Sequence, residues 1–256
     1  MQTIRIEDRD HVRWVWLNRP EKKNAFNDVM LDELREAFET PDDATRLFVL
    51  TGSGDAFCAG ADLAWMAKSR EQSAEENVAA SEKLGDFFRV LNETPRTVVA
   101  RVNGPAMGGA LGLIACCDIV VAVDSVRFAF SEVRLGLAPA VISPFVLRKI
   151  GEANARRYFL SGEFFGADEA RRMNLVHEVT ADDGLDKKVA EIVATLRANG
   201  PLAMGESKTL IRNVLAMPSE QTARYTAETI ARLRVSDEGQ EGLRAFIEKR
   251  KPAWRD

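Results

Sequence analysis

Apolar positions repeat at two different spacings along this chain, and the balance between them changes near residue 143. Before that point, short apolar runs predict strands of a covered sheet, and apolar residues three or four positions apart predict helices between them. The expected strands cover residues 11–18, 47–51, 97–102 and 119–123, and the expected helices cover 27–38, 62–68 and 71–93. Asn27 stands where a helix N-cap is expected.

From Pro144 onward, helical spacing dominates the pattern. The expected helices cover residues 152–161, 167–173, 184–199, 201–216, 219–235 and 237–249, with one short strand near 176–179. We therefore predict one α/β core over residues 1–195 and a C-terminal helical region over residues 196–256. The apolar faces of such a region need a surface to cover, either the chain's own core or a neighbouring subunit.

Composition narrows the class of protein. The chain has 256 residues, 46% of them hydrophobic, which is enough to bury a large core. Its net charge of −4 offers no basic surface for nucleic acid, and no apolar run reaches the roughly 18 residues of a membrane span. The first ten residues are charged and lack the apolar run of a signal peptide. We expect a cytoplasmic protein that binds neither nucleic acid nor a membrane.

Cysteine and histidine are too few and too scattered for several kinds of site. Only His11 and His177 are present, on distant segments, which disfavours a metal centre and a histidine-activated nucleophile. The three cysteines, Cys58, Cys116 and Cys117, form no CxxC pair. We expect them to be reduced and to serve as packing residues.

The segment from Val102 to Asp118 carries the clearest sign of chemistry. An apolar strand runs into an Asn-Gly-Pro turn, and Gly108 and Gly109 then begin an apolar helical run. Backbone N–H groups at such a turn have no internal partner and can bind an oxyanion. The alternative is a buried helix that packs closely through its glycines.

Two further segments complete the candidate site. Residues 57–63 form a second strand-to-helix turn with free backbone donors, and Glu132 follows the apolar run 128–130. A carboxyl group among apolar residues has a raised pKa, which suits a general acid–base. The alternative is that Glu132 pairs with Arg134 or caps a turn.

Taken in order, these motifs resemble the enoyl-CoA hydratase/isomerase (crotonase) family. The resemblance rests on Asn18-Arg19-Pro20, Asn24-Ala25-Phe26-Asn27, residues 57–63, Asn103-Gly104, Gly108-Gly109, Cys117-Asp118 and residues 132–136. It spans nearly the whole chain, and it implies a spiral of ββα turns with a C-terminal helical region used in trimer formation. Pairs of trimers would give a hexamer.

The resemblance also implies an acyl-CoA thioester as substrate, with no metal or redox cofactor. Ala61 and Gly109 would supply the two N–H donors to the thioester oxygen, and Glu132 would be the catalytic carboxylate. The residues implied in substrate or CoA binding are Ala25, Ala59, Gly60, Asp62, Leu63, Gly108, Gly112 and Lys249. For Lys249, as for Lys208, a solvated helix face is the alternative.

The sequence departs from the family pattern at Gly112, where the best-known hydratases carry a second glutamate. Three interpretations follow: a hydratase that uses Glu132 alone, an isomerase that moves a proton between the α and γ carbons, or a pocket that Gly112 opens for a bulky acyl group. A CoA-binding protein without catalytic activity is the alternative from another class.

The run from Ser131 to Phe145 resembles the bacterial methylglutaconyl-CoA hydratase subgroup of leucine and isoprenoid breakdown. Its substrate has a second carboxylate, for which Arg134 and Arg101 are the candidate partners. The leading hypothesis is therefore a hydratase of a branched or substituted 2-enoyl-CoA.

Overall fold

The computed structural model describes residues 1–42 and 44–255 of the chain. The chain forms two compact units, one made of residues 1–94 and 98–189 and the other of residues 95–97 and 190–256. The boundary expected after residue 195 falls in the last turn of helix α7 (Leu185–Arg197).

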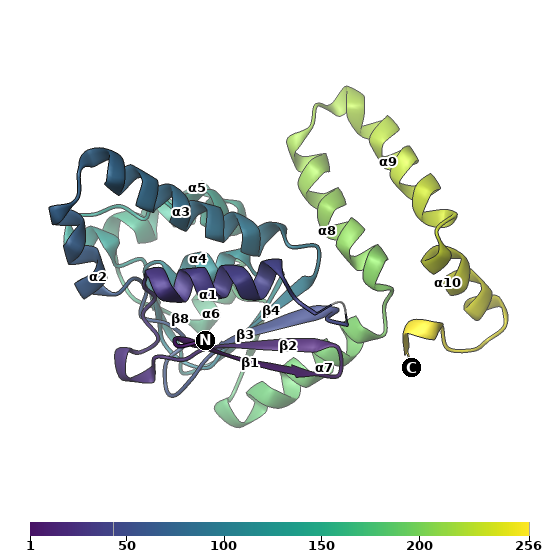
Figure 1. Ribbon diagram of the computed structural model, residues 1–256, viewed down its shortest axis with the longest axis horizontal. Coiled ribbons are helices and arrows are strands. Elements are labelled where there is room, and N and C mark those ends of the chain that lie inside the picture. The colour runs from purple at the N-terminus through teal and green to yellow at the C-terminus, as the bar shows by residue number, and fades with distance from the viewer. Residues whose placement is uncertain (43, 256) are drawn as a thin grey trace. The chain divides into compact units, whose positions relative to one another are not determined.

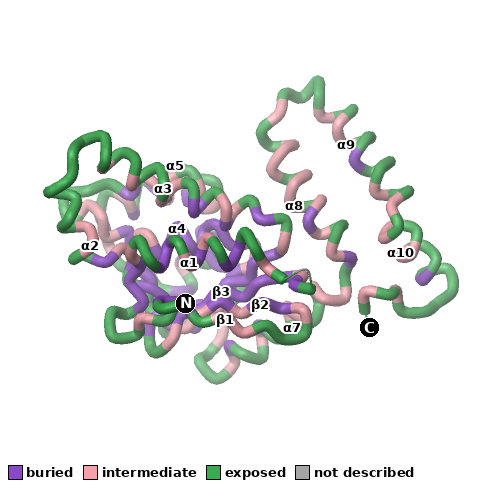
Figure 2. The backbone as a smooth tube through the Cα atoms, viewed as in Figure 1, coloured by how far each residue is buried: buried purple, intermediate pink, exposed green. Residues whose placement is uncertain are grey.

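The first unit is built on a six-stranded sheet (Figure 1). The first two strands are antiparallel, and the pairs β2–β3, β4–β6 and β6–β9 are parallel. Every residue of β3 is buried, as its continuous apolar run predicts, and Figure 2 shows this strand in the buried colour. The order of strands is β1 (Ile4–Arg9), β2 (Val12–Leu17), β3 (Leu47–Gly52), β4 (Thr97–Val102), β6 (Ile119–Val123) and β9 (Glu178–Thr180).

The first unit also contains a second sheet, which has three strands. It contains β5 (Ala106–Met107), β7 (Arg127–Ala129) and β8 (Phe165–Gly166). A strand of the large sheet is followed by one of the small sheet twice in succession, β4 by β5 and β6 by β7, and helices follow. This repeat is the ββα spiral that the resemblance implies.

Two long helices of the first unit begin at residues whose side chains cap them. Asn27 accepts a hydrogen bond from the Met30 N–H at 3.0 Å and starts α1 (Asp28–Glu39), as predicted. Ser73 and Glu76 form a capping box that starts α3 (Ala74–Glu93). The other helices are α2 (Leu63–Ala67), α4 (Ala110–Cys116), α5 (Ser143–Ser161) and α6 (Ala167–Arg172), with single 3₁₀ turns at Pro20–Lys22, Lys68–Glu71, Glu132–Leu135 and Asp182–Gly184.

Several elements carry too little local pattern to be predicted. Strand β1 was not expected, because its charged outer residues mask the alternation that buries Ile4 against β2. Helix α5 extends nine residues before the expected start at 152, although Gly151, with a φ of 72°, interrupts its helical backbone. The three short strands of the small sheet were also missed, because two or three residues carry no periodicity of their own.

Over the described residues from 190 onward, all regular structure of the second unit is helical. It contains α8 (Pro201–Ala216), α9 (Ser219–Arg234), α10 (Asp237–Ile247) and a 3₁₀ turn at Ala253–Arg255, which confirms the expected helices. Large apolar side chains remain exposed on it, among them Leu215, Val235 and Phe246. The expected trimer or hexamer stays a prediction. None of the helices in the described residues is long and apolar enough to cross a lipid bilayer.

Candidate active site

The first turn of the site, residues 57–63, joins β3 to α2 and lies against the segment that leads into the second turn. The N–H groups of Phe57 and Cys58 donate to the Pro105 carbonyl at 3.1 and 3.2 Å, and the Met107 N–H donates to the Cys58 carbonyl at 3.0 Å. These bonds fix the two turns side by side.

Backbone pairing with Phe26 sets the direction of the Ala61 N–H. The Phe26 N–H donates to the Gly60 carbonyl, and the Asp62 N–H donates to the Phe26 carbonyl, both at 2.9 Å. In such a parallel bridge, the groups on either side of Ala61 face Phe26, so the N–H of Ala61 itself points the other way. Ala61 also lines the cavity described below.

The second turn depends on two glycines. Gly108 has a φ of 53°, in the left-handed region, and its N–H donates to the Ala129 carbonyl at 2.9 Å. Gly109 precedes α4, and a Cβ atom there would lie 2.6 Å from Cζ of Phe26. A Cβ at Gly60 would lie 2.7 Å from the Met107 carbonyl oxygen, so the turns approach more closely than a side chain at Gly60 would allow.

Two backbone donors are left unpaired at this junction. Within the described residues, the N–H groups of Ala61 and Gly109 donate to no backbone carbonyl, while those of Asp62 and Gly108 do. A backbone N–H group that is shielded from water and has no hydrogen-bond partner costs free energy. It therefore favours binding a ligand that supplies an acceptor. The pair matches the requirement for an oxyanion hole.

Glu132 brings a carboxylate to the same junction. Its Oε1 lies 3.3 Å from where a Cβ of Gly108 would stand, and its Oε2 is buried with no hydrogen-bond partner. Burial raises the pKa of Glu132 above its usual value of 4.5, although its own backbone N–H lowers it slightly. The Arg134 guanidinium lies 4.7 Å from the centre of the Phe164 ring instead of on Glu132, so the alternative pairing of Glu132 with Arg134 is wrong.

Ala61, Gly109 and Glu132 line one cavity of about 1020 Å³. Its wall is mainly apolar, and its charged residues are Lys22, Asp62, Glu132 and Arg134. Of the residues expected in the site, it brings together Ala25, Ala59, Gly60, Ala61, Asp62, Leu63, Gly108, Gly109 and Glu132.

Comparison with known proteins agrees with this arrangement. The sequence model of one family, described as enoyl-CoA hydratase/isomerase, matches residues 7–256. The chain belongs to the enoyl-CoA hydratase/isomerase family.

Relatives of this family align along nearly their whole length. A crotonyl-CoA hydratase of Syntrophomonas wolfei is 32% identical and covers 98% of this chain and 96% of its own. A mevalonyl-coenzyme A hydratase of Aspergillus fumigatus is 33% identical over 96% of this chain and 92% of its own. The crystal structure of an enoyl-CoA hydratase from Shewanella pealeana superposes with a TM-score of 0.94 at 39% identity, covering 99% of this chain and 96% of that one.

The structure corrects the expectation that Gly112 opens room for an acyl group in this enoyl-CoA hydratase/isomerase. Gly112 is buried inside α4 and is not among the residues that line the cavity. A Cβ at Gly112 would lie 2.3 Å from Cγ2 of Ile142 and 2.9 Å from Cε1 of Phe88. Those two side chains occupy the space and themselves line the cavity.

Arg101 is not among the residues that line the cavity. Arg101, considered as a partner for a substrate carboxylate, binds Asp186 at 2.7 Å and donates to the Thr51 hydroxyl, so that interpretation is wrong. Lys249 belongs to the second unit, and its contact with CoA stays a prediction.

Cys58 is not a nucleophile in this structure. Burial raises the pKa of its thiol to about 12, and its Sγ lies 3.1 Å from the Asn24 carbonyl oxygen. A thiol with this pKa stays protonated at neutral pH, which fits the expected packing role. Lys22, Phe26 and Ile142 also line the cavity but were not predicted from the sequence. Phe26 and Lys22 could have been found, because they stand inside or beside the motif that contains Ala25, whereas no motif marks Ile142.

Proposed function

We propose that this enzyme adds water across the double bond of a branched or substituted 2-enoyl-CoA. The observation that carries the proposal is the buried, unpartnered Oε2 of Glu132 beside the unpaired N–H groups of Ala61 and Gly109. A carboxylate without a structural partner is free to move protons, and two free donors are free to bind a developing oxyanion.

The reaction follows from these three groups. The Ala61 and Gly109 N–H groups bind the thioester oxygen and draw electrons from the conjugated double bond. Glu132 takes a proton from water as the water oxygen bonds to Cβ, and the π electrons move onto the thioester oxygen as an enolate. The protonated Glu132 then delivers its proton to Cα, which restores the thioester. Its raised pKa suits both halves of this cycle.

An enoyl-CoA isomerase is the second candidate, and one observation favours it. The cavity holds a second carboxylate, Asp62, but its two oxygens already bind Arg19 and the Ala64 N–H. Glu132 is therefore the only carboxylate in the cavity wall, among the described residues, without such a partner. One carboxylate is sufficient to carry a proton from the α to the γ carbon.

The cavity wall and one relative suggest the acyl group. The large apolar wall suits a branched chain, and a relative is named a mevalonyl-coenzyme A hydratase. Arg134 lines the cavity and could pair with a second carboxylate, so 3-methylglutaconyl-CoA is our specific candidate. The pathway in which it would act is leucine or isoprenoid breakdown.

Incubation with 2-enoyl-CoA and 3-enoyl-CoA in ¹⁸O-labelled water tests the reaction. Label at Cβ supports hydration, whereas movement of the double bond without label supports the isomerase.

In Glu132→Gln, we expect kcat to fall by about 10²–10⁴ because general acid–base catalysis is lost. Glu178→Gln, an exposed carboxylate on β9, is the control. The rising limb of the kcat/KM pH profile should lie above 4.5, because Glu132 must lose its proton to act as a base. Full turnover by Glu132→Gln would refute the catalytic role.

A further inference from the structure

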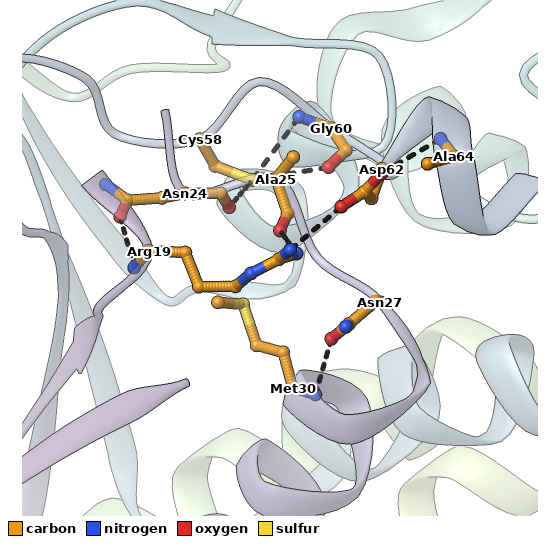
Figure 3. Close-up of polar contacts among 9 residues, drawn as sticks. All are labelled: Arg19, Asn24, Ala25, Asn27, Met30, Cys58, Gly60, Asp62 and Ala64. Atoms are coloured by element: carbon orange, nitrogen blue, oxygen red, sulfur yellow. Dashed lines mark hydrogen bonds and ion pairs between the residues drawn. The ribbon is translucent and has the colours of Figure 1, made fainter. Parts of the chain in front are cut away.

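Arg19 joins the backbone at Ala25 to the Asp62 side chain of the first turn, as Figure 3 shows. Its guanidinium donates to the Ala25 carbonyl at 2.6 Å and to Oδ2 of Asp62 at 2.9 Å. Asp62 is the residue directly after Ala61, and its Oδ1 accepts from the Ala64 N–H at 2.9 Å. One side chain therefore ties the segment before Phe26 to the peptide that follows the Ala61 donor.

Asn24 anchors the same clamp to the large sheet. It is fully buried, with a φ of 57°, and its Oδ1 accepts from the Arg19 N–H at 3.0 Å. Its Nδ2 donates to the carbonyls of Ser53 and Ala56, both at 2.8 Å, just beyond the end of β3. The Arg19 backbone thus has a fixed position relative to the strand that leads into the turn.

The Arg19–Asp62 ion pair is shielded from water. The two side chains are 15% and 11% exposed, whereas other ion pairs among the described residues, such as Arg101–Asp186 and Arg232–Glu206, have at least one exposed partner. Burial by itself raises the pKa of Asp62, but hydrogen bonds from Arg19 and from the N–H groups of Ala64 and Trp65 outweigh it, and the pKa lies below its usual value. The pair stays charged at neutral pH, and losing one partner would leave a charge with little water around it.

We propose that Arg19 and Asp62 are positioning residues, which hold the Ala61 N–H toward the thioester oxygen and thereby act on kcat instead of on substrate affinity. The proposal rests on the proposed role of Ala61 as an oxyanion donor. Asp62 was expected to bind CoA; in this assignment its carboxylate serves the turn. A shift of the donor by about 1 Å can cost about 10² in rate, which makes a rigid clamp useful.

Arg19→Lys tests the clamp, because an ammonium group cannot bind a carboxylate and a carbonyl in the fixed fork of a guanidinium. We expect kcat to fall by about 10–100-fold, with KM for the acyl-CoA changed by no more than about twofold. The matched control is Arg13→Lys. Arg13 is 11% exposed and binds the Asp8 carboxylate and the Ala37 carbonyl, but it does not line the cavity. Its loss should lower Tm without lowering kcat.

A spectroscopic readout separates this proposal from the proposed function. Butyryl-CoA labelled with ¹³C at the thioester carbonyl cannot be hydrated, so its bound carbonyl stretch reports the donors alone. Wild type should lower this frequency, and Arg19→Lys should shift it back toward the value in solution. If wild type polarises the carbonyl and the variant does not, the clamp is supported even if the enzyme proves to be an isomerase.

Three outcomes would overturn the clamp. They are an unchanged kcat in folded Arg19→Lys, a rise in KM alone, and an equal loss of kcat in Arg13→Lys. If Arg19→Lys does not fold, Asp62→Asn decides instead. It keeps an oxygen for the Ala64 N–H and replaces the charged acceptor of Arg19 with an NH₂ group, which cannot accept from the guanidinium, so the same fall in kcat and the same loss of carbonyl shift are expected.

Discussion

The two turns that provide the oxyanion donors are held in different ways. The first turn depends on polar contacts: Arg19 and Asp62 form a shielded ion pair, and Asn24 binds three carbonyls. The second turn depends on close packing, with Gly109 against the ring of Phe26. A backbone N–H can thus be aimed either by satisfying its neighbours with hydrogen bonds or by leaving no room for a side chain.

The difference predicts that the second turn tolerates almost no added atom. In Gly109→Ala, the new Cβ would stand 2.6 Å from Cζ of Phe26, so the turn or the ring must move. We expect kcat to fall by about 10²–10³, the cost of losing one oxyanion donor. Steady-state kinetics measure this, with Gly166→Ala as the control because a Cβ there meets nothing within 4 Å.

A second substitution shows whether packing is the cause. Phe26→Leu removes the far end of the ring, so the double variant with Gly109→Ala should recover part of the lost rate. If the double variant is as slow as the product of the two single effects, the contact with Phe26 does not aim the donor.

Substitution of Gly112 tests whether the close packing around Gly109 continues one turn further along α4. In Gly112→Ala, the Cβ would meet Ile142 at 2.3 Å, and we expect overpacking to cost about 1–3 kcal/mol of stability. Urea unfolding measures this cost. Ile142→Ala removes the nearest methyl group, so the double variant should lose less stability than the sum of the two changes. A fully additive result would contradict the steric account.

Cys58, in the first turn, should show the smallest effect. Because burial raises the pKa of its thiol to about 12, iodoacetamide at pH 8 should leave it unmodified and the native activity unchanged. Mass spectrometry of the treated, folded protein checks this, and the urea-unfolded protein provides the positive control. Rapid labelling of native Cys58 would show that the turn opens, contrary to a rigid clamp.

Local features of the sequence predicted much of the fold. The strands over Thr97–Val102 and Ile119–Val123 were predicted to the residue, since each is a continuous apolar run bounded by polar or turn residues. Asn27 was predicted as a cap because an amide side chain can satisfy the first helical N–H groups of the residues beside it. The order of short motifs was also sufficient for the resemblance that the family comparison confirms.

Contacts between distant segments could not be obtained in this way. Gly112 and Ile142 are 30 residues apart in the sequence. The residues around Gly112 do not show that a side chain from a distant segment fills the space next to this glycine. The pairing of Arg19 with Asp62 spans 43 residues and two motifs. The sequence by itself determined which residues carry donors and charge, because those are properties of single residues and their neighbours. Only the tertiary structure decided that the oxygens of Asp62 are occupied while Oε2 of Glu132 is unpaired, because partners and burial depend on how the whole spiral packs.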